Sequence, residues 1–334
     1  MLSLSRAYPQ IPQRPVFSLV LANTLLSTVP GISGAGPTPE KTLLTPVLDA
    51  ELVATGAITS MPLKPNTPTG CPTPATITRA MTVLTGIQPF FVNAGLSHPP
   101  TVPCMDVAGE PGGDPREGDA VPGADALYLR GRWVGSFFDR YGDLLVIGEC
   151  VPGGTTTALS LLRMLGYDAR VSSSYVDNPR TAKEAVSAAV LERYGTTDDP
   201  LEAVRRAGDP MVAVAAGMAA GFDGPVLLAG GTQMLAVAAV LRGLGERVPD
   251  PVTTVYIRDD ESASFAKTAA EIGTDPLYVD PGFGEIGHPG LARYCAGEVK
   301  EGMGAGGALF LAHQLGYSGD AIRQAITEFL AAYG

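Results

Sequence analysis

The sequence has few of the residues that usually hold metals or form disulfides. Only four cysteines and three histidines occur among 334 residues, no two cysteines form a C-x-x-C pair, and the histidines are far apart. This spacing lacks the usual zinc and dithiol redox motifs, so we expect no metal site. Widely spaced single cysteines are typical of reduced thiols, and we therefore expect a cytoplasmic protein.

Basic residues and long apolar runs are also scarce. The chain has 23 lysines and arginines against 34 aspartates and glutamates, a formal net charge of −11. A surface of this sign repels nucleic acid and anionic lipid, although a local cationic pocket for one phosphorylated metabolite is compatible with it. No uninterrupted apolar run reaches the about 18 residues that a membrane span needs. The short apolar run at 16–22 follows three prolines and fits a first core strand better than a signal peptide.

Short apolar runs alternate along the chain with longer helical patterns. Several of the runs are continuously apolar, as strands buried on both faces are. The expected strands are 16–22, 89–94, 144–148, 225–229, 252–257 and 277–279. The expected helices are 75–85, 125–141, 155–165, 181–194, 200–220, 232–244, 262–272, 305–315 and 320–333. This alternation predicts an α/β fold with a doubly wound, mainly parallel sheet and helices on both faces. We expect a single domain over 1–334, in which the N-terminal part and the last helix form a small accessory lobe.

The most informative segment, residues 143–157, reads DLLVIGECVPGGTTT. An apolar strand ends near Glu149, and a glycine–threonine corner leads into a helix. The corner consists of Gly153, Gly154, Thr155 and Thr156. Backbone N–H groups and the positive end of a helix dipole at such a corner bind anions, most often phosphate. A tight connection that needs glycines for its geometry alone is the alternative. Because a carboxylate beside a phosphate is costly, Glu149 is expected to bind a ribose hydroxyl or to move a proton.

A second strand–glycine–helix corner follows the apolar run at 225–229. It consists of Gly230, Gly231 and Thr232. The corner is suited to a sugar or a second ligand group, and close packing of a helix on the sheet explains the glycines equally well.

The glycine-dense segment 298–307 carries Glu301. Glycines after it let the backbone approach a ligand, so Glu301 is expected to project into a pocket. A carboxylate held against apolar surroundings has a raised pKa and acts as a general base near neutral pH. A solvated acidic turn before a helix is the alternative.

Arg205 and Arg206 are adjacent in a predicted helix and cannot lie on the same face of it. One of them is expected to point to solvent and the other to reach a phosphate, and the alternative is that both lie on the surface.

Four motifs occur in a fixed order along the chain: GECVPGGTTTA, DPLEAVRRAG, PVLLAGGTQMLA and KEGMGAGGAL. Together they resemble nicotinate-nucleotide:dimethylbenzimidazole phosphoribosyltransferase, and the whole chain resembles the divergent branch of this family found in archaea and cyanobacteria. The resemblance implies an enzyme that moves ribose 5-phosphate from nicotinate mononucleotide to an aromatic base. The product is an α-ribotide for the lower ligand of a cobamide. The resemblance also implies that no cofactor is needed and that the protein is a homodimer.

The resemblance assigns roles to individual residues. Glu301 opens an E-G-x-G-A motif and corresponds to the general base, and Glu149 corresponds to the second functional glutamate. The residues that correspond to the phosphate and ribose site are Gly153, Gly154, Thr155, Thr156, Arg206, Gly230, Gly231 and Thr232. The residues expected at the base pocket are Thr73, Ala75 and Met303.

Two motifs differ from the family pattern. Relatives carry P-Q-x-V-T at the base pocket, whereas residues 74–78 read PATIT and lack the glutamine. The pair Gly153-Gly154 also replaces a G-N pair of the relatives. The base is therefore open between dimethylbenzimidazole, adenine and another aromatic base. Two other functions stay open: a catalytically inactive nucleotide- or base-binding protein on the same fold, and a different ribosyl transfer.

Overall fold

An eight-stranded sheet forms the centre of the computed structural model, which describes residues 3–9, 11–36, 38–62, 66–67 and 69–333. The strands are β1 (Ser3–Leu4), β2 (Pro15–Ala22), β3 (Phe90–Gly95), β4 (Cys104–Asp106), β5 (Leu144–Cys150), β6 (Val226–Ala229), β7 (Asp250–Thr254) and β8 (Leu277–Asp280). Their order across the sheet is β1-β8-β7-β6-β5-β2-β3-β4. All neighbours run parallel except β1, which pairs antiparallel with β8. The predicted doubly wound, mainly parallel sheet is confirmed.

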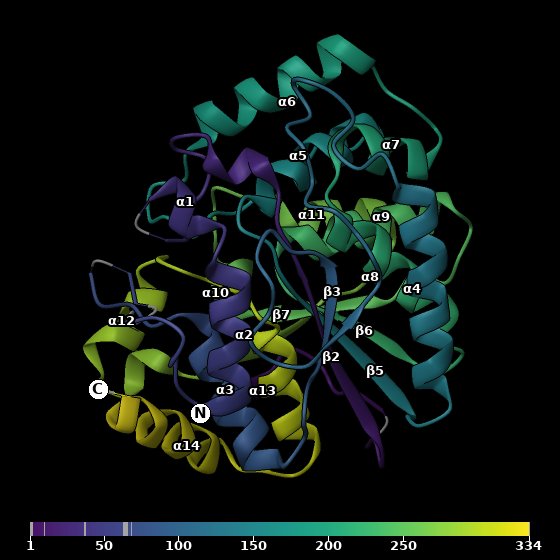
Figure 1. Cartoon of the computed structure of the whole chain (residues 1–334). Helices are drawn as coiled ribbons and strands as arrows, with labels where there is room; N and C mark the ends of the chain where they lie inside the picture. The colour runs from purple at the N-terminus through teal and green to yellow at the C-terminus, as the bar shows by residue number, and fades with distance from the viewer. Residues whose placement is uncertain (1–2, 10, 37, 63–65, 68, 334) are drawn as a thin grey trace.

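The winding of the chain changes direction once, between β2 and β5. The chain passes from β2 through β3 to β4 at one edge, returns to place β5 on the other side of β2, and continues through β6 and β7 to β8. Because both windings start at this central pair, the loops after β2 and β5 lie side by side (Figure 1). This arrangement positions the candidate site.

Helices cover both faces of the sheet (Figure 1). The first face carries α4 (Ala124–Asp139), α5 (Gly154–Met164), α6 (Arg180–Tyr194), α7 (Pro200–Ala207), α8 (Pro210–Gly221), α9 (Thr232–Gly243) and α11 (Phe265–Ile272). The second face carries α2 (Thr45–Thr55), α3 (Pro74–Thr85), α12 (Pro289–Cys295), α13 (Ala305–Gln314) and α14 (Gly319–Tyr333). Short elements are α1 (Pro39–Thr42), α10 (Val255–Arg258) and the 3-10 turns η1 (Leu25–Thr28) and η2 (Phe283–Glu285). Side chains along β2 alternate between the two faces of the sheet and contribute to the hydrophobic core on each. Val16 and Val20 lie in the core of the first face, and Phe17 and Leu19 lie in the core of the second.

Glycines bring α4 and α8 into backbone contact. A Cβ atom at any of four helical positions would strike the backbone of the other helix. These positions are Gly131 and Gly135 of α4 and Gly217 and Gly221 of α8. The two helices therefore cross more closely than side chains would allow.

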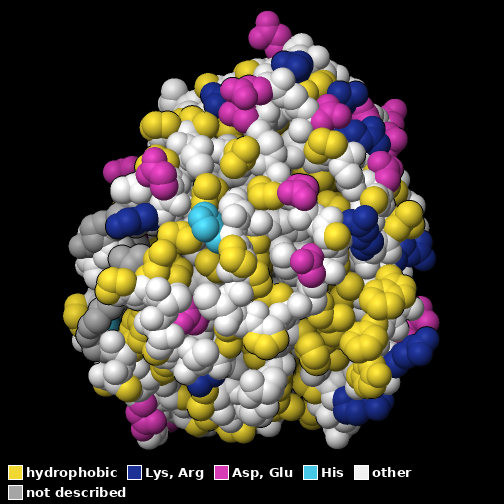
Figure 2. Space-filling view, in the orientation of Figure 1, with side chains coloured by type: hydrophobic (Ala, Val, Ile, Leu, Met, Phe, Trp, Pro, Cys, Tyr) yellow, Lys and Arg dark blue, Asp and Glu magenta, His cyan; other side chains and the backbone are white. Residues whose placement is uncertain are grey.

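The outer side of α4 is apolar. Leu129, Trp133 and Phe137 recur every four residues, as a helical stripe requires, Tyr141 follows just after the helix, and all four are exposed. Figure 2 shows a hydrophobic patch over this helix, at the right of the view.

Two predicted elements differ from the structure. The helix predicted over 200–220 is interrupted, because Asp209 caps a new helix that begins at Pro210, after an extended Gly208. The strand predicted over 252–257 ends at Thr254, and residues 255–258 form α10 instead. The short strands β1 and β4 and helices α1, α2 and α12 were not predicted.

The N-terminal strand and the last helix both join the main assembly. β1 extends the sheet beside β8, and α14 packs against α3. The division into a single domain with an accessory lobe stays a prediction. Among the described residues, no helix has the length and apolar character that crossing a membrane requires.

Candidate active site

The loops after β2 and β5 meet at the point where the winding reverses. In open α/β sheets the crevice outside the carboxyl ends of the strands at such a point binds ligands. The buried Asn23 follows β2 and joins two neighbouring loops: its Nδ2 donates to the Leu43 carbonyl (3.1 Å) and its Oδ1 accepts from the Ser97 N–H (2.8 Å). Sequence reasoning missed Asn23, because no glycine corner follows β2.

The predicted glycine–threonine corner lies directly opposite the loop after β2. Gly153 caps α5 with a φ of +80°, a conformation that favours glycine, and a Cβ atom there would lie 3.0 Å from Ser27 Cβ. A Cβ atom at Gly154 would collide with the side chain of Gln233. Gly153 is thus required by its left-handed conformation and by the approach of the Ser27 backbone, whereas Gly154 lets the flexible Gln233 side chain come close. The α5 N-terminus has no side-chain cap among the described residues.

Three buried polar atoms at the two glycine corners lack partners. Within the described part of the chain, Thr156 Oγ1, Thr232 Oγ1 and Gln233 Oε1 make no hydrogen bond. Leaving a buried polar group unsatisfied costs about 1–3 kcal/mol. Such atoms gathered at the ends of neighbouring helices are expected of a site that is completed by a polar ligand. Two of the three residues, Thr156 and Thr232, were predicted from the sequence.

Glu149 lies at the end of β5 and is buried, with 3% of its surface exposed. Its Oε2 accepts the Val151 N–H at 3.2 Å. Burial first, and then the negative charges of Glu301 and Asp209, raise the pKa of Glu149 to about 8, while hydrogen bonds from Val151 and Gln233 partly oppose the rise. The carboxyl group is therefore protonated at neutral pH until a cationic ligand compensates its charge.

Glu301 lies on the loop before α13 and is partly buried. Its Oε1 accepts the N–H groups of Gly302 (3.2 Å) and Gly306 (3.0 Å), the latter in the first turn of α13. Its Oε2 accepts the Thr254 N–H (3.2 Å) and the Thr253 hydroxyl (3.3 Å) at the end of β7. Burial raises the pKa of Glu301 to about 7, and these hydrogen bonds limit the rise. This carboxyl group can take a proton near neutral pH.

The three predicted corners converge. A Cβ atom at Gly230 would lie 3.5 Å from the side chain of Glu149, and one at Gly231 would lie 3.9 Å from Glu301 Cβ. The Met303 N–H donates to the Glu149 carbonyl at 2.9 Å. The segments that carry Glu149, Gly230 and Glu301 are distant in sequence and are in contact in the fold.

Two further buried carboxylates were missed by sequence reasoning. Asp209 accepts the Thr157 hydroxyl at 2.6 Å, and burial raises its pKa to about 6. Asp49 of α2 accepts the Thr73 hydroxyl at 3.2 Å and faces the Cys150 thiol at 3.8 Å, and burial raises its pKa to about 7. The Asp209-Pro210 pair is a helix-start signal that could have indicated Asp209. The carboxyl groups that we call the acidic cluster are Asp49, Glu149, Asp209 and Glu301.

The residues predicted at the base pocket lie beside this cluster. Thr73 caps α3 and contacts Asp49, and Ala75 follows in the first turn of the same helix. Met303 lies next to α3, because the Thr78 hydroxyl donates to its carbonyl at 2.8 Å. Their role in binding a base stays a prediction.

Arg206 lies in a surface network on α7. Its guanidinium contacts Asp119 at 2.6 Å and Glu202 at 2.7 Å, and it stacks over the ring of Tyr194 at 4.9 Å. Its charge is thus already compensated in the ligand-free protein, and its contact with a phosphate stays a prediction. Thr155 is partly exposed in the first turn of α5.

The described residues contain no group of three or more histidines, cysteines, aspartates or glutamates that could hold a metal ion. The four carboxyl groups of the acidic cluster are held by hydroxyl, thiol and backbone N–H groups. Carboxyl groups held in this way can transfer protons and stabilise a developing positive charge.

Comparison with known proteins places the chain beside archaeal relatives. It is 43% identical over 325 residues to a UPF0284 protein of Methanosarcina mazei, an alignment that covers 93% of each chain. It is 44% identical over 321 residues to a UPF0284 protein of Thermococcus gammatolerans, with 94% of this chain and 96% of the relative covered. These relatives confirm the predicted archaeal branch. No family model matches the chain.

Solved structures share the fold. The nicotinate-nucleotide-dimethylbenzimidazole phosphoribosyltransferase of Thermus thermophilus superimposes with a TM-score of 0.63 at 18% sequence identity. The superposition covers 95% of this chain and 83% of that chain. A structure of CobT from the same organism gives a TM-score of 0.62 at 16% identity, with 96% of this chain and 85% of that chain covered.

Proposed function

The chain belongs to the UPF0284 family, and from the arrangement of its candidate site we propose that it is a phosphoribosyltransferase. It moves ribose 5-phosphate from nicotinate mononucleotide to an aromatic base and releases nicotinate. The observation that carries this proposal is the contact of two proton-holding carboxyl groups, Glu149 and Glu301, with one glycine corner. The shared fold with a solved enzyme of this activity supports it.

Glu301 is the proposed general base. Its carboxylate takes the imidazole proton of the incoming base, and the nitrogen so released forms a bond to the anomeric carbon. The bond from that carbon to nicotinate breaks on the opposite face, and its electron pair neutralises the pyridinium nitrogen. The product is an α-linked ribotide, and the proton stays on Glu301. With a pKa of about 7, the group is basic enough to accept the proton and is still partly ionised at neutral pH.

Glu149 is the proposed electrostatic partner of the ribose. Positive charge develops on the sugar as the bond to nicotinate breaks, and a carboxylate stabilises that charge. Because burial keeps Glu149 protonated without a ligand, a pyridinium ribotide would favour its ionisation. The unpartnered hydroxyls of Thr156 and Thr232 are suited to oxygens of the ribose phosphate, together with the N–H groups after Gly153.

The base pocket is proposed at Thr73, Ala75 and Met303, which lie on the α3 side of Glu301. Dimethylbenzimidazole and adenine are the bases to compare. A homodimer is also proposed, from the resemblance alone, and light scattering on the purified protein tests it.

Product analysis decides the proposed function. Purified protein is incubated with nicotinate mononucleotide and each of several aromatic bases, and mass spectrometry is used to detect the ribotide and free nicotinate. We expect a ribotide from at least one base, with one nicotinate released per ribotide. Tight nucleotide binding in calorimetry without product from any base would show a catalytically inactive binding protein instead. Nicotinate release without base transfer would indicate another ribosyl reaction.

A further inference from the structure

An apolar surface lies on the outer side of α4, away from the candidate site. It includes Trp133, the only tryptophan of the chain, which is 70% exposed. Leu129 and Phe137 lie one turn before and after it, and Tyr141 follows the helix. Phe90 of β3 joins them, because its ring lies 5.0 Å from a buried phenylalanine of α4 that Phe137 also contacts. We call Phe90, Leu129, Trp133, Phe137 and Tyr141 the α4 patch.

The composition of the α4 patch is that of a protein interface. Four of its five residues are aromatic, and the same helix carries three exposed arginines. Aromatic residues and arginine are enriched in protein–protein interfaces relative to the rest of the surface. Contiguous exposed apolar patches with a polar rim mark interaction sites on soluble proteins. The patch is therefore expected to be covered by a partner (Figure 2).

The helix that carries the patch is held firmly from below. Gly131 and Gly135 bring its backbone into contact with that of α8, and its inner side chains, among them Leu127 and Val134, are buried. Binding to a surface that is already ordered costs little conformational entropy of the backbone. The α4 patch is thus prepared for association before any partner arrives.

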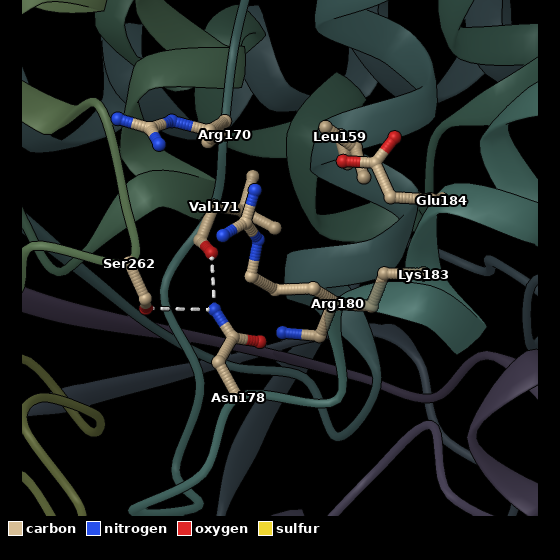
Figure 3. Close-up of a pocket in the computed structure, with 8 residues that line it drawn as sticks. All are labelled: Leu159, Arg170, Val171, Asn178, Arg180, Lys183, Glu184 and Ser262. Carbon is tan, nitrogen blue, oxygen red and sulfur yellow. Dashed lines mark hydrogen bonds between the residues drawn. The ribbon is translucent and has the colours of Figure 1, made fainter.

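No comparable apolar surface occurs elsewhere in the part of the chain that the structure describes. A hollow at the start of α6 is lined mainly by polar and charged side chains, among them Asn178, Arg180 and Lys183 (Figure 3). A hollow between α3 and α13 is apolar but leaves no room for a water molecule. The other exposed large apolar side chains come from four separate segments: Ile11, Leu25, Val83, and Tyr175 with Val176. A second copy of the chain therefore matches the patch best with its own α4 patch, in an isologous contact.

The charges of α4 also favour pairing of this helix with itself. The whole chain has a net charge of −11, which makes two copies repel, whereas residues 124–141 carry three arginines and two aspartates. Asp125 lies in the first turn, and its side chain is 58% exposed although Arg205 contacts it at 2.7 Å. Arg140 lies at the other end and makes no ion pair with the described residues. An antiparallel pair brings the acid of each copy to the free arginine of the other.

Helical spacing determines which residues meet in such a pair. When two copies of α4 cross antiparallel at Trp133, residues at equal distances before and after it oppose each other. Leu129 of one copy then faces Phe137 of the other, on both sides of the axis, and the two tryptophans meet at the centre. Asp125 comes close to Arg140 at each end. A central aromatic residue surrounded by smaller contacts and a charged rim is the usual arrangement of a stable interface.

We propose that two copies of this chain associate through the α4 patch, antiparallel about a two-fold axis at Trp133. The interface is argued from the residues of this chain and does not depend on the proposed reaction. It gives a surface to the homodimer that was proposed from the resemblance alone. An anionic membrane is the less suitable partner, because the net charge of −11 repels it.

Light scattering and tryptophan fluorescence on the whole chain, without any ligand, test the interface. We expect a mass of twice 34.5 kDa, and a Trp133 emission that moves to longer wavelength when dilution separates the copies. Trp133→Arg should weaken association at least about thirtyfold, as loss of a central aromatic residue does. Val176→Arg, at an exposed apolar residue outside the patch, is the matched control and should leave association unchanged. Circular dichroism checks folding, and Leu129→Arg keeps the test decisive if Trp133→Arg unfolds.

A charge exchange tests the antiparallel geometry. Arg140→Asp places two acids together at each end of the pair, so it should weaken association. Adding Asp125→Arg to the same chain restores opposite charges and should restore association. An apolar contact of any other geometry would not respond to this exchange.

Four results would overturn the interface. One is a monomer at the highest soluble concentration with a solvent-exposed Trp133 emission, which would leave the patch to a different protein. Another is a dimer of unchanged affinity in both Trp133→Arg and Leu129→Arg. A third is a double charge variant as weak as Arg140→Asp alone, and the fourth is an emission that shifts only with vesicles of anionic lipid. A patch-dependent dimer that forms no ribotide would support the interface and reject the proposed reaction.

Discussion

Two groups of buried charge, opposite in sign, meet at consecutive residues. The acidic cluster surrounds the carboxyl ends of β5 and β7 and includes Glu301, whereas Lys300 faces Asp260 and lies close to a second buried lysine, Lys183. Both groups keep a buried charge small in the ligand-free protein, the acids by holding protons and Lys183 by releasing one. The comparison teaches that buried groups of opposite charge can be separated by a single peptide bond, here the one between Lys300 and Glu301.

The largest expected effect is on the turnover number, and it tests the acidic group. Replacing Glu301 with alanine should lower the turnover number by roughly a hundredfold or more, because a general base is lost. Steady-state rates with a saturating base measure it, and Glu271→Gln on the exposed side of α11 is the matched control. Normal turnover of Glu301→Ala would show that Glu301 is not the general base.

The second effect concerns stability against pH. Glu149 releases its proton near pH 4.5 when unfolded and near pH 8 when folded, so the folded state binds more protons between these values and stability falls as pH rises. Lys183 releases its proton near pH 10.5 when unfolded and near pH 7 when folded, so stability rises with pH across that window. Stability should therefore pass through a minimum between about pH 7 and 8.

Melting temperatures from pH 5 to 10 test these opposite slopes. Glu149→Gln should make the falling limb shallower, because the raised pKa values of Asp49, Asp209 and Glu301 keep part of it, and Lys183→Met should flatten the rising limb. Each change should amount to a few kcal/mol at most, since buried groups relax. A curve without a minimum, or a falling limb that is equally steep in Glu149→Gln and in the unaltered protein, would show that these groups do not hold their protons as described.

The smallest effect concerns one hydroxyl. Thr156→Val replaces a buried, unpartnered hydroxyl with a methyl of similar volume, so the ligand-free protein should gain up to about 1 kcal/mol of unfolding free energy. Affinity for nicotinate mononucleotide should fall at the same time. Chemical denaturation and calorimetry measure the two quantities. Thr157→Val is the contrasting variant, because its hydroxyl binds Asp209 and its loss should destabilise the protein. Unchanged ligand affinity in Thr156→Val would place the ribotide away from this corner.

Sequence reasoning found the parts of the fold and site that leave a local signal. Continuous apolar runs such as 144–148 identified the buried strands, and the glycine corners beside them indicated Glu149 and Glu301. The two-residue β1 and three-residue β4 are too short for any periodicity, so they were missed. The break between α7 and α8 was missed although Asp209-Pro210 is a helix start, because apolar residues continue on both sides of it.

The rest of the site depends on tertiary packing. Lys183 is buried in α6, and its ammonium group donates to the carbonyl of Ser172 on the preceding segment, a contact that no local pattern in the sequence indicates. Asp49 lies in α2, a helix that was not predicted, and its raised pKa follows from burial, which hydrogen bonds from Thr73 and Cys150 partly oppose. Arg206 illustrates the opposite case: its motif position is clear in the sequence, but Asp119, which neutralises it, comes from a distant loop. Local patterns thus locate the backbone corners, whereas the balance of charge requires the folded chain.

The glycine crossing of α4 and α8 has a consequence for the acidic cluster. Asp209 begins α8, and backbone contact leaves the two helices no side-chain layer in which to slide. Helices α4 and α8 are therefore expected to move as one rigid unit that links the outer surface to the interior. Displacing the exposed Trp133 on the outside of α4 should therefore also shift Asp209, whose negative charge raises the pKa of Glu149. A partner bound to the outer face of α4 is thereby expected to change the acidity of the distant crevice.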